Sequence, residues 1–311
     1  MANVMKWLSL SLALLMGVAQ TPAWARCRLS RVGTPHGEKF VLENDLVRVE
    51  VLGFGGRLHS FRLKKGDAEF LEPIEESFIR HSRLLPPTLI SNQAGFTDWF
   101  WGERAPEPAP YRTRVVSETD EEIGLEMTGV SGRWKLVRRV TLHNGSRAVA
   151  QEITITNAGS APATLGYWAH LIPNIPRFVN ANGESLLFIP GKRGGDLIQG
   201  RRTASLPKEG PQEVMTRQSE GFFAIAEPWA AMIAPESGET LLMKSERETF
   251  APDGMLYHWQ AGKPGDRRST LEMIHSPRLL APAESARYRI TLKAFSSRDE
   301  VFPSPSTQTA K

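Results

Sequence analysis

The residue types best suited to holding a small polar ligand gather in one short stretch, where Asp98, Trp99 and Trp101 lie beside Gly95 and Gly102. An indole offers a flat apolar surface to the C–H face of a sugar ring, and a carboxylate accepts hydrogen bonds from sugar hydroxyls. A loop that exposes these side chains would form a saccharide-binding platform. A loop that tucks the same aromatic residues into the interior is the alternative, and the sequence leaves both open.

Motifs of nucleotide, serine-hydrolase and metal sites are absent from the chain. The seven histidines are scattered, and no two of them have the spacing of zinc ligands. A glycine-rich turn at residues 53–56 is followed by a strand-like alternation, whereas a dinucleotide-binding loop opens a helix. We therefore expect no metal and no cofactor.

Several charged or titratable side chains lie where they could reach a ligand. Arg57 follows the glycine-rich turn and could hold a hydroxyl or a sugar carboxylate, and His258 lies near the end of a predicted strand. Glu272 and His275 are three positions apart, so on one strand they point to opposite faces. A structural or solvated role is the alternative for each of these residues.

Period-two alternation of apolar and polar residues dominates the chain and is typical of antiparallel strands. The clearest pair is 134–142 and 148–156, which flank Asn144-Gly145, a signature of a type I′ hairpin. Further strands are predicted at 46–52, 57–63, 112–118, 121–129, 163–170, 186–190, 222–226, 230–234, 240–246, 255–260, 269–275 and 285–295. The sequence predicts an all-β fold, one large antiparallel sandwich with few or no helices, as a single domain over residues 26–301. Residues 302–311 are predicted to be a flexible tail.

Composition and charge exclude several classes of protein. The chain has 311 residues with Lys+Arg 38 and Asp+Glu 34, a net charge of +4. Without Lys6 of the leader the net charge is 37 − 34 = +3, which is too small to indicate a nucleic-acid-binding protein. The single cysteine, Cys27, excludes an internal disulfide framework.

The first 25 residues have the pattern of a secretory signal peptide. Lys6 precedes an apolar run over residues 7–19, and residues 23–25 form an Ala-Trp-Ala cleavage site. The alternative is a membrane anchor, but the run is shorter than the roughly 20 residues of a spanning helix. We expect residues 1–25 to be removed and the protein to be periplasmic or secreted, with no stable membrane anchor. The oligomeric state stays open.

Three stretches together resemble the galactose mutarotase-like superfamily, which includes the aldose 1-epimerases, and suggest an exported branch of it. Residues 42–71 give a strand, a Gly-Gly turn, a strand and then a phrase like the family's Gly-x-Glu-x-Leu, as the family begins. Residues 134–170 resemble its central hairpin and the strand that ends in a histidine. Residues 271–295 resemble its closing glutamate strand, Leu-x-Pro turn and last strand.

The resemblance implies a large antiparallel β-supersandwich with a sugar cleft on one face. It implies that Glu272 is the catalytic base and that His170 is the acid or a substrate-binding histidine, since a carboxylate and an imidazole suit the proton transfers of mutarotation. Classical members carry a further histidine in the region that compares with residues 91–101, where this chain has none. We take Asn92 from that region as a substrate-binding candidate, together with Arg57, Asp98, Trp99, Trp101 and His258.

Two hypotheses about function follow, both with a saccharide as the ligand. The first is an exported carbohydrate-active protein that performs mutarotase-like or epimerase-like acid–base chemistry. The second is a non-catalytic carbohydrate-binding protein of the same fold. Whether the protein is an enzyme depends on whether Glu272 and His170 converge on one face. A polysaccharide lyase or hydrolase is a third interpretation, but it needs a tyrosine or paired carboxylates in the cleft.

Overall fold

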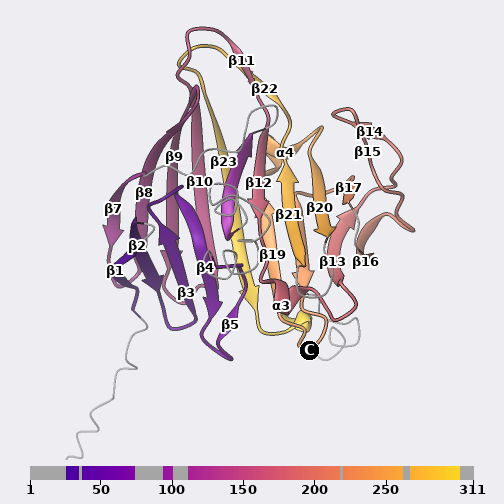
Figure 1. Cartoon of the computed structure of the whole chain (residues 1–311), viewed down its shortest axis with the longest axis horizontal. Coiled ribbons are helices and arrows are strands. Elements are labelled where there is room, and N and C mark those ends of the chain that lie inside the picture. The colour runs from indigo at the N-terminus through magenta and orange to yellow at the C-terminus, as the bar shows by residue number, and fades with distance from the viewer. Residues whose placement is uncertain are drawn as a thin grey trace, which may run out of the picture.

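The computed structural model describes residues 26–34, 37–73, 94–100, 111–217, 220–261 and 267–301. Two large antiparallel sheets make up most of it, and their strands run roughly along the vertical of Figure 1. The predicted all-β class is therefore confirmed. The predicted signal peptide, the tail, Asn92 and Trp101 all lie outside the described residues.

The first sheet has ten strands and carries the candidate site. In spatial order its strands are β1 (Arg28–Thr34), β2 (Gly37–Glu43), β3 (Val47–Leu52), β4 (Arg57–Leu63), β6 (Phe96–Phe100), β12 (Tyr167–Leu171), β21 (Arg268–Ile274), β20 (Met255–Ala261) and β17 (Glu220–Phe223), and β5 (Ala68–Glu69) pairs with β4. The central strands β6, β12 and β21 come from distant parts of the sequence, so the site is assembled only when the sheet forms.

The second sheet has nine strands and shows the alternation most clearly. Its order is β16 (Gly210–Arg217), β13 (Glu184–Gly191), β18 (Trp229–Ile233), β19 (Thr240–Ser245), β23 (Ser285–Phe295), β10 (Ala148–Asn157), β9 (Trp134–His143), β8 (Glu122–Ser131) and β7 (Arg112–Glu118). In β9 every second residue is buried, beginning with Trp134. This sheet therefore packs one face on the core and presents the other to solvent.

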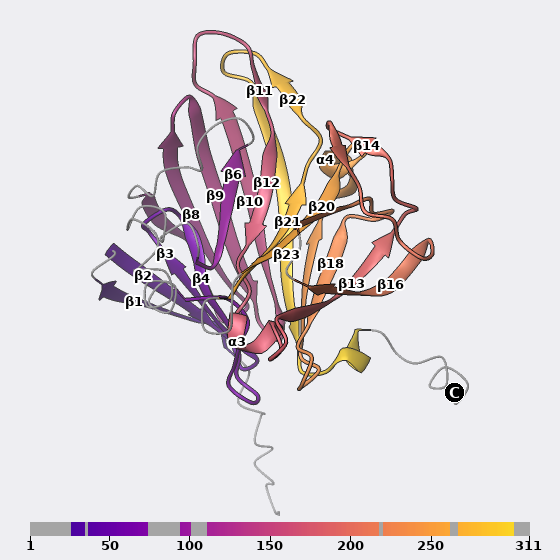
Figure 2. The same ribbon diagram turned by 45° about the vertical axis from the view of Figure 1, so that its right-hand side comes forward.

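Smaller elements complete the described residues. Two short antiparallel pairs join β11 (Ala163–Leu165) to β22 (Arg278–Leu280) and β14 (Leu197–Ile198) to β15 (Arg201–Arg202). The first pair extends beyond the large sheets, and the second lies near β20 in both views (Figures 1 and 2). The helices are the short α3 (Ile175–Phe178), α4 (Arg247–Phe250) and the 3₁₀ helix η2 (Arg298–Glu300).

The core lies between the two large sheets. The largest cluster of buried apolar residues runs from Cys27 to Ala294 and takes members from both. Across this interface the ring centroid of Tyr167 on β12 lies 4.3 Å from the ring centroid of Tyr288 on β23. Below, the face of the ten-stranded sheet toward this core is called the inner face, and the opposite one the outer face.

Two local predictions differ from the structure. The 134–156 hairpin is confirmed, but its turn is not type I′, because that turn needs positive φ at both central residues and only Gly145 has it, at 64°. The predicted strand at 163–170 is two strands, β11 and β12, which belong to different sheets.

Candidate functional site

The centre of the candidate site is a histidine–glutamate contact across two neighbouring strands. His170 on β12 and Glu272 on β21 are paired in register, so both side chains project from the same face of the sheet. His170 Nε2 lies 3.3 Å from Glu272 Oε1, and the two side chains are 1% and 4% exposed. The two residues that the resemblance singled out therefore meet, although a hundred residues separate them in the sequence.

Strand alternation explains why both side chains point away from the core. Tyr167, Ala169 and Leu171 of β12 belong to the main core cluster, so His170 between them projects from the outer face. Leu271 and Met273 flank Glu272 in the same way on β21. All five residues of β12 are buried, so this part of the sheet is covered on both faces.

Burial sets the protonation of Glu272. It raises the pKa of the carboxyl group to about 8, against a hydrogen bond from Thr270 and the positive charge of Arg201, which both favour the carboxylate. The Thr270 hydroxyl donates to Glu272 Oε1 at 2.8 Å. Glu272 Oε2 is buried and has no hydrogen-bond partner among the described residues. At neutral pH the carboxyl group therefore keeps its proton.

Burial has the opposite consequence for His170. Burial and, to a smaller extent, the positive charge of Arg57 together lower the pKa of the imidazole to about 3. The ring is therefore neutral at neutral pH. His170 Nδ1 is buried without a hydrogen-bond partner in the described part of the chain. The site thus holds a protonated acid in contact with a neutral base.

Trp99 lies directly against this pair. Its indole stacks on the His170 ring, with centroids 4.5 Å apart and planes 16° from parallel. Trp99 is partly exposed, while its Nε1 is buried and lacks a partner among the residues described. The prediction that Trp99 belongs to a ligand site stays a prediction. Its indole lies beside the His170–Glu272 pair, on the same face of the sheet.

The stretch around Trp99 is a strand, which corrects the predicted loop. β6 lies inside the ten-stranded sheet between β4 and β12, and its residues alternate between the two faces. Gly95 makes this close packing possible. It has φ of 65°, and a Cβ there would meet the carbonyl oxygen of Leu58 on β4.

Asp98 projects from the inner face, opposite to Trp99. It forms an ion pair with Arg138 of β9, and it accepts a hydrogen bond from the Tyr167 hydroxyl at 2.8 Å. Arg138 also donates to Gln151 at 2.9 Å. Asp98 therefore links the two sheets from its place between Phe96 and Phe100 on the inner face, and the structure does not bring it to the face that carries His170.

His258 also lies on the inner face, in the middle of β20 and away from a strand end. Its Nδ1 is 2.7 Å from the carbonyl oxygen of Thr270, and its Nε2 is 3.4 Å from Gln260 Oε1. Gln260 in turn contacts Thr216 of the nine-stranded sheet. His275 is likewise on the inner face, against Tyr167 and Tyr288, so the predicted opposition of Glu272 and His275 is confirmed.

An aromatic row on the outer face was not predicted from the sequence. Four side chains, Trp99, Trp168, Tyr257 and Phe222, gather there with Met255 and Ile274 in a cluster separate from the main core. Tyr257 lies 5.9 Å from Trp168 and 4.7 Å from Phe222, centroid to centroid. We call these four residues the outer aromatic row. Trp168 belongs to the row because β12 pairs it with Trp99 of β6 and with Ile274 of β21, on the outer face.

Two arginines lie near the pair. Arg57, at the start of β4, is 2% exposed, and its charge is felt at His170. The Arg201 guanidinium, on β15, lies 5.7 Å from the ring centroid of Trp168 and 4.6 Å from that of Phe222. The charge of Arg57 acts on His170, and that of Arg201 acts on Glu272.

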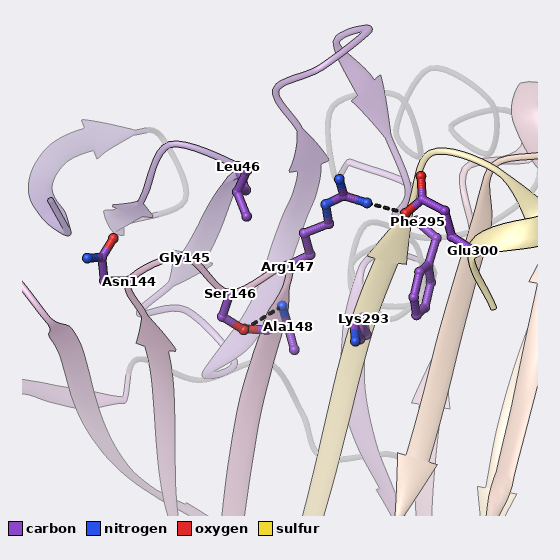
Figure 3. A pocket seen from close by; sticks show the side chains of 9 residues that line it. All are labelled: Leu46, Asn144, Gly145, Ser146, Arg147, Ala148, Lys293, Phe295 and Glu300. Carbon is purple, nitrogen blue, oxygen red and sulfur yellow. Dashed lines mark hydrogen bonds and ion pairs between the residues drawn. The ribbon is translucent and has the colours of Figure 1, made fainter. Parts of the chain in front are cut away.

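Other features of the described residues lie apart from this site. They contain no group of three or more His, Cys, Asp or Glu side chains that could hold a metal ion, and no helix long and apolar enough to span a membrane. A cavity of about 510 Å³ lies at the β9–β10 turn, with Arg147 ion-paired to Glu300 at its wall (Figure 3). It shares no lining residue with the His170 site.

Comparisons with known proteins bear on the fold. No family model matches the chain. It is 28% identical to the membrane protein insertase YidC of Cupriavidus taiwanensis over 137 residues. These aligned residues cover 42% of this chain and 22% of the insertase. The match thus spans about a fifth of that relative's length.

Solved structures match over most of the chain at low identity. A galactose mutarotase-like protein from Clostridium acetobutylicum shares 9% identity with a TM-score of 0.60, covering 88% of this chain and 99% of that one. One from Lactobacillus casei shares 12% identity with a TM-score of 0.54, over 83% and 100%. A TPR-domain containing protein from Parabacteroides distasonis shares 12% identity with a TM-score of 0.60, and this chain covers 54% of it. The chain therefore has the galactose mutarotase-like fold.

Proposed function

We propose that the protein binds a saccharide at the outer face of the ten-stranded sheet and interconverts its anomers by acid–base catalysis. The observation that carries this proposal is the contact of His170 Nε2 with Glu272 Oε1 at 3.3 Å, beside the outer aromatic row. Aromatic faces hold the C–H face of a sugar, while an acid and a base can act on its polar atoms. The fold shared with galactose mutarotase-like proteins supports this assignment.

The resting protonation suggests which residue is which. His170 Nε2 lies 3.3 Å from Glu272 Oε1, an oxygen that accepts a hydrogen bond from Thr270, and we assign the proton of the neutral imidazole to Nε2. This arrangement puts the carboxyl proton on Oε2 and leaves His170 Nδ1 as a free acceptor, and these are the two atoms without partners in the described residues. Glu272 is then the acid and His170 the base, the reverse of the roles implied by the family resemblance.

The reaction needs no further reagent. His170 Nδ1 takes the proton of the anomeric hydroxyl, the bond between the anomeric carbon and the ring oxygen breaks, and Glu272 Oε2 gives its proton to that oxygen. The product is the open-chain aldehyde, held between an imidazolium and a carboxylate. Rotation about the bond to the carbonyl carbon and the reverse proton transfers give the other anomer and restore both residues.

The test is polarimetry of anomer interconversion with several aldoses and uronates. Glu272→Gln or His170→Gln should each lower the rate by about 10²–10⁴. The double variant should cost little more than the worse single change, because residues that act as a unit are non-additive. Glu122 and His143 form a matched control, an exposed pair 3.5 Å apart whose Gln variants should leave the rate unchanged. A wild-type rate equal to that of buffer would refute catalysis for these sugars.

The second candidate is a non-catalytic saccharide-binding protein. One observation favours it: Trp99, Tyr257 and Phe222 are partly exposed, whereas His170 and Glu272 are buried and in contact with each other. If the pair is only a structural contact, the protein binds a sugar without accelerating interconversion. Glu272→Gln then changes neither the binding nor the rate.

We also propose that the protein is exported to the periplasm or secreted, with cleavage after Ala25. The support is the leader pattern of Lys6, the apolar run and the Ala-Trp-Ala site. Mass spectrometry of the exported fraction should find Arg26 as the new N-terminus. Recovery of the protein only in the cytosol, with residues 1–25 attached, would overturn the assignment.

A further inference from the structure

A third side chain, Thr270, contacts the Glu272 carboxyl group at the oxygen that also faces His170. Thr270 and Glu272 are two positions apart on β21, so both side chains project from the outer face. The hydroxyl of Thr270, a residue 4% exposed, donates to Glu272 Oε1 at 2.8 Å. His170 Nε2 lies 3.3 Å from the same oxygen. Both neighbours therefore converge on Oε1, whereas Oε2 has no hydrogen-bond partner among the described residues.

The strand holds Thr270 in the place from which its hydroxyl acts. Thr270 is paired in register with Trp259 of β20. Its carbonyl oxygen lies 2.7 Å from His258 Nδ1 and can only accept, so this nitrogen donates. Because threonine is branched at Cβ, its side chain has few rotamers on such a fixed backbone. The hydroxyl is therefore kept at Oε1 by the sheet itself.

A hydroxyl donor at Oε1 decides which oxygen of Glu272 carries the carboxyl proton. A protonated carboxyl group donates through the oxygen that bears the proton and accepts best through the other one. Donation from Thr270 to Oε1 therefore favours the proton on Oε2. A single hydrogen bond of ordinary strength changes the ratio of two such arrangements by roughly twofold to tenfold.

The position of that proton also decides the tautomer of His170. With Oε1 bare, the neutral imidazole carries its proton on Nε2, and Nδ1 keeps its lone pair. A proton on Oε1 would face Nε2 across the 3.3 Å contact, so the imidazole would carry its own proton on Nδ1. That second arrangement offers a neutral imidazole N–H and a carbonyl oxygen, which are a weaker acid and a weaker base than a carboxylic acid and an imidazole lone pair.

We propose that Thr270 is the positioning residue of the acid–base pair, because its hydroxyl keeps the carboxyl proton on Glu272 Oε2 and the lone pair of His170 on Nδ1. This inference rests on the proposed acid–base function and adds the residue that prepares the pair for it. The same hydrogen bond strengthens during the reaction, because Glu272 becomes a carboxylate as it gives its proton away. In this role Thr270 acts through Glu272 and does not act on the sugar itself.

NMR of the imidazole nitrogens tests the proposal without any sugar. The protonated and bare nitrogens of a neutral imidazole differ widely in chemical shift, so proton–nitrogen correlation spectra at neutral pH give the tautomer. The signals of His170 are identified by their loss in His170→Gln. Wild type should carry the proton on Nε2. Thr270→Val and the smaller Thr270→Ala should each shift the ratio toward the Nδ1–H tautomer by roughly twofold to tenfold, whereas Thr270→Ser should resemble wild type.

The matched control is a buried threonine of the other large sheet. Thr240 on β19 donates to the carbonyl oxygen of Gly238 at 3.1 Å, so Thr240→Val also removes one buried hydroxyl and its hydrogen bond. It should leave the tautomer of His170 unchanged. A wild-type proton on Nδ1 overturns the proposal by itself. An unchanged tautomer in a folded Thr270→Val or Thr270→Ala protein overturns it as well.

Kinetics of interconversion give a second readout, with the sugar that reacts fastest in polarimetry. Thr270→Val should lower kcat by roughly tenfold to a hundredfold and leave KM little changed, because the lost hydrogen bond stabilises the carboxylate that forms in the reaction. Thr270→Ser should keep most of the wild-type kcat. An equal loss in Thr270→Ser and Thr270→Val would show a merely structural role and contradict the proposal.

The two proposals can fail separately. If the tautomer responds to Thr270→Val but the wild type never accelerates interconversion, the catalytic proposal is removed and the proton assignment stands. If the wild type accelerates interconversion and Thr270→Val changes neither the tautomer nor kcat, the catalytic proposal stands and this one is removed.

Discussion

Replacing Asp98 with asparagine separates a structural role from a ligand-binding role. Asp98 balances Arg138, and their side chains are 3% and 1% exposed. Asp98→Asn removes the negative charge and leaves Arg138 with neutral Gln151, near the like charge of Arg57. Breaking a buried ion pair by removing one partner costs about 3–5 kcal/mol.

That loss is a large fraction of the stability of a protein domain, which is about 5–15 kcal/mol. Thermal unfolding followed by circular dichroism should show a fall in Tm of about 6–20 °C, at about 2–4 °C per kcal/mol for a large domain. The double variant Asp98→Asn with Arg138→Met should lose less unfolding free energy than the two single variants together, because it has no uncompensated charge.

The control is an exposed ion pair of the same chemistry. Asp67 lies 2.9 Å from Arg62, and its side chain is 78% exposed. Its φ is 50°, a conformation that asparagine tolerates, so Asp67→Asn should cost less than about 1 kcal/mol. If Asp98→Asn retains wild-type stability but loses sugar affinity, Asp98 is a sugar ligand as the sequence predicted, and the structural reasoning is wrong.

Three further predictions follow from burial and charge. The pKa of Glu272 is about 8 in the folded protein and 4.5 ordinarily, so the stability contributed by its protonated form is complete below pH 4.5 and is lost as the pH rises to 8. In urea titrations over this range, the unfolding free energy of the wild type should fall by on the order of 5 kcal/mol relative to that of Glu272→Gln. Parallel pH profiles of the two proteins would refute the buried protonated acid. Arg57→Met should raise the unfolding free energy of the ligand-free protein by about 1–3 kcal/mol by removing an unbalanced buried charge, whereas a loss of several kcal/mol would mean that the guanidinium is paired. Trp99→Ala should weaken sugar binding by about 1–3 kcal/mol, and Trp229→Ala, on the other sheet, should not; equal binding by both variants would remove Trp99 from the site.

The nine-stranded sheet was predictable because one of its faces meets solvent. In β9, β10 and β23 buried residues alternate with more exposed ones, and this alternation is visible in the sequence. The strands of the site give no such signal. β12 is buried at every residue, and β6 directs the charged Asp98 into the interior, where its partner is Arg138 of the other sheet.

The candidate site could be predicted only in part. The family resemblance supplied His170 and Glu272, but the contact between them depends on a strand register that no local pattern specifies. The same register brings Trp168 and Tyr257 to the outer face. An arginine after a turn is usually solvated, so the burial of Arg57 could be found only from the packing around it.

The most direct test of the account is the exchange rate between the anomers of the aldose or uronate that the protein binds most tightly, measured at equilibrium by magnetisation-exchange NMR. Wild-type protein should accelerate the exchange, and Glu272→Gln should reduce that acceleration by about 10²–10⁴ while the calorimetric affinity for the sugar is preserved. Tight binding of that sugar by the wild type with no acceleration of exchange would contradict the central claim that His170 and Glu272 act as a catalytic acid–base pair.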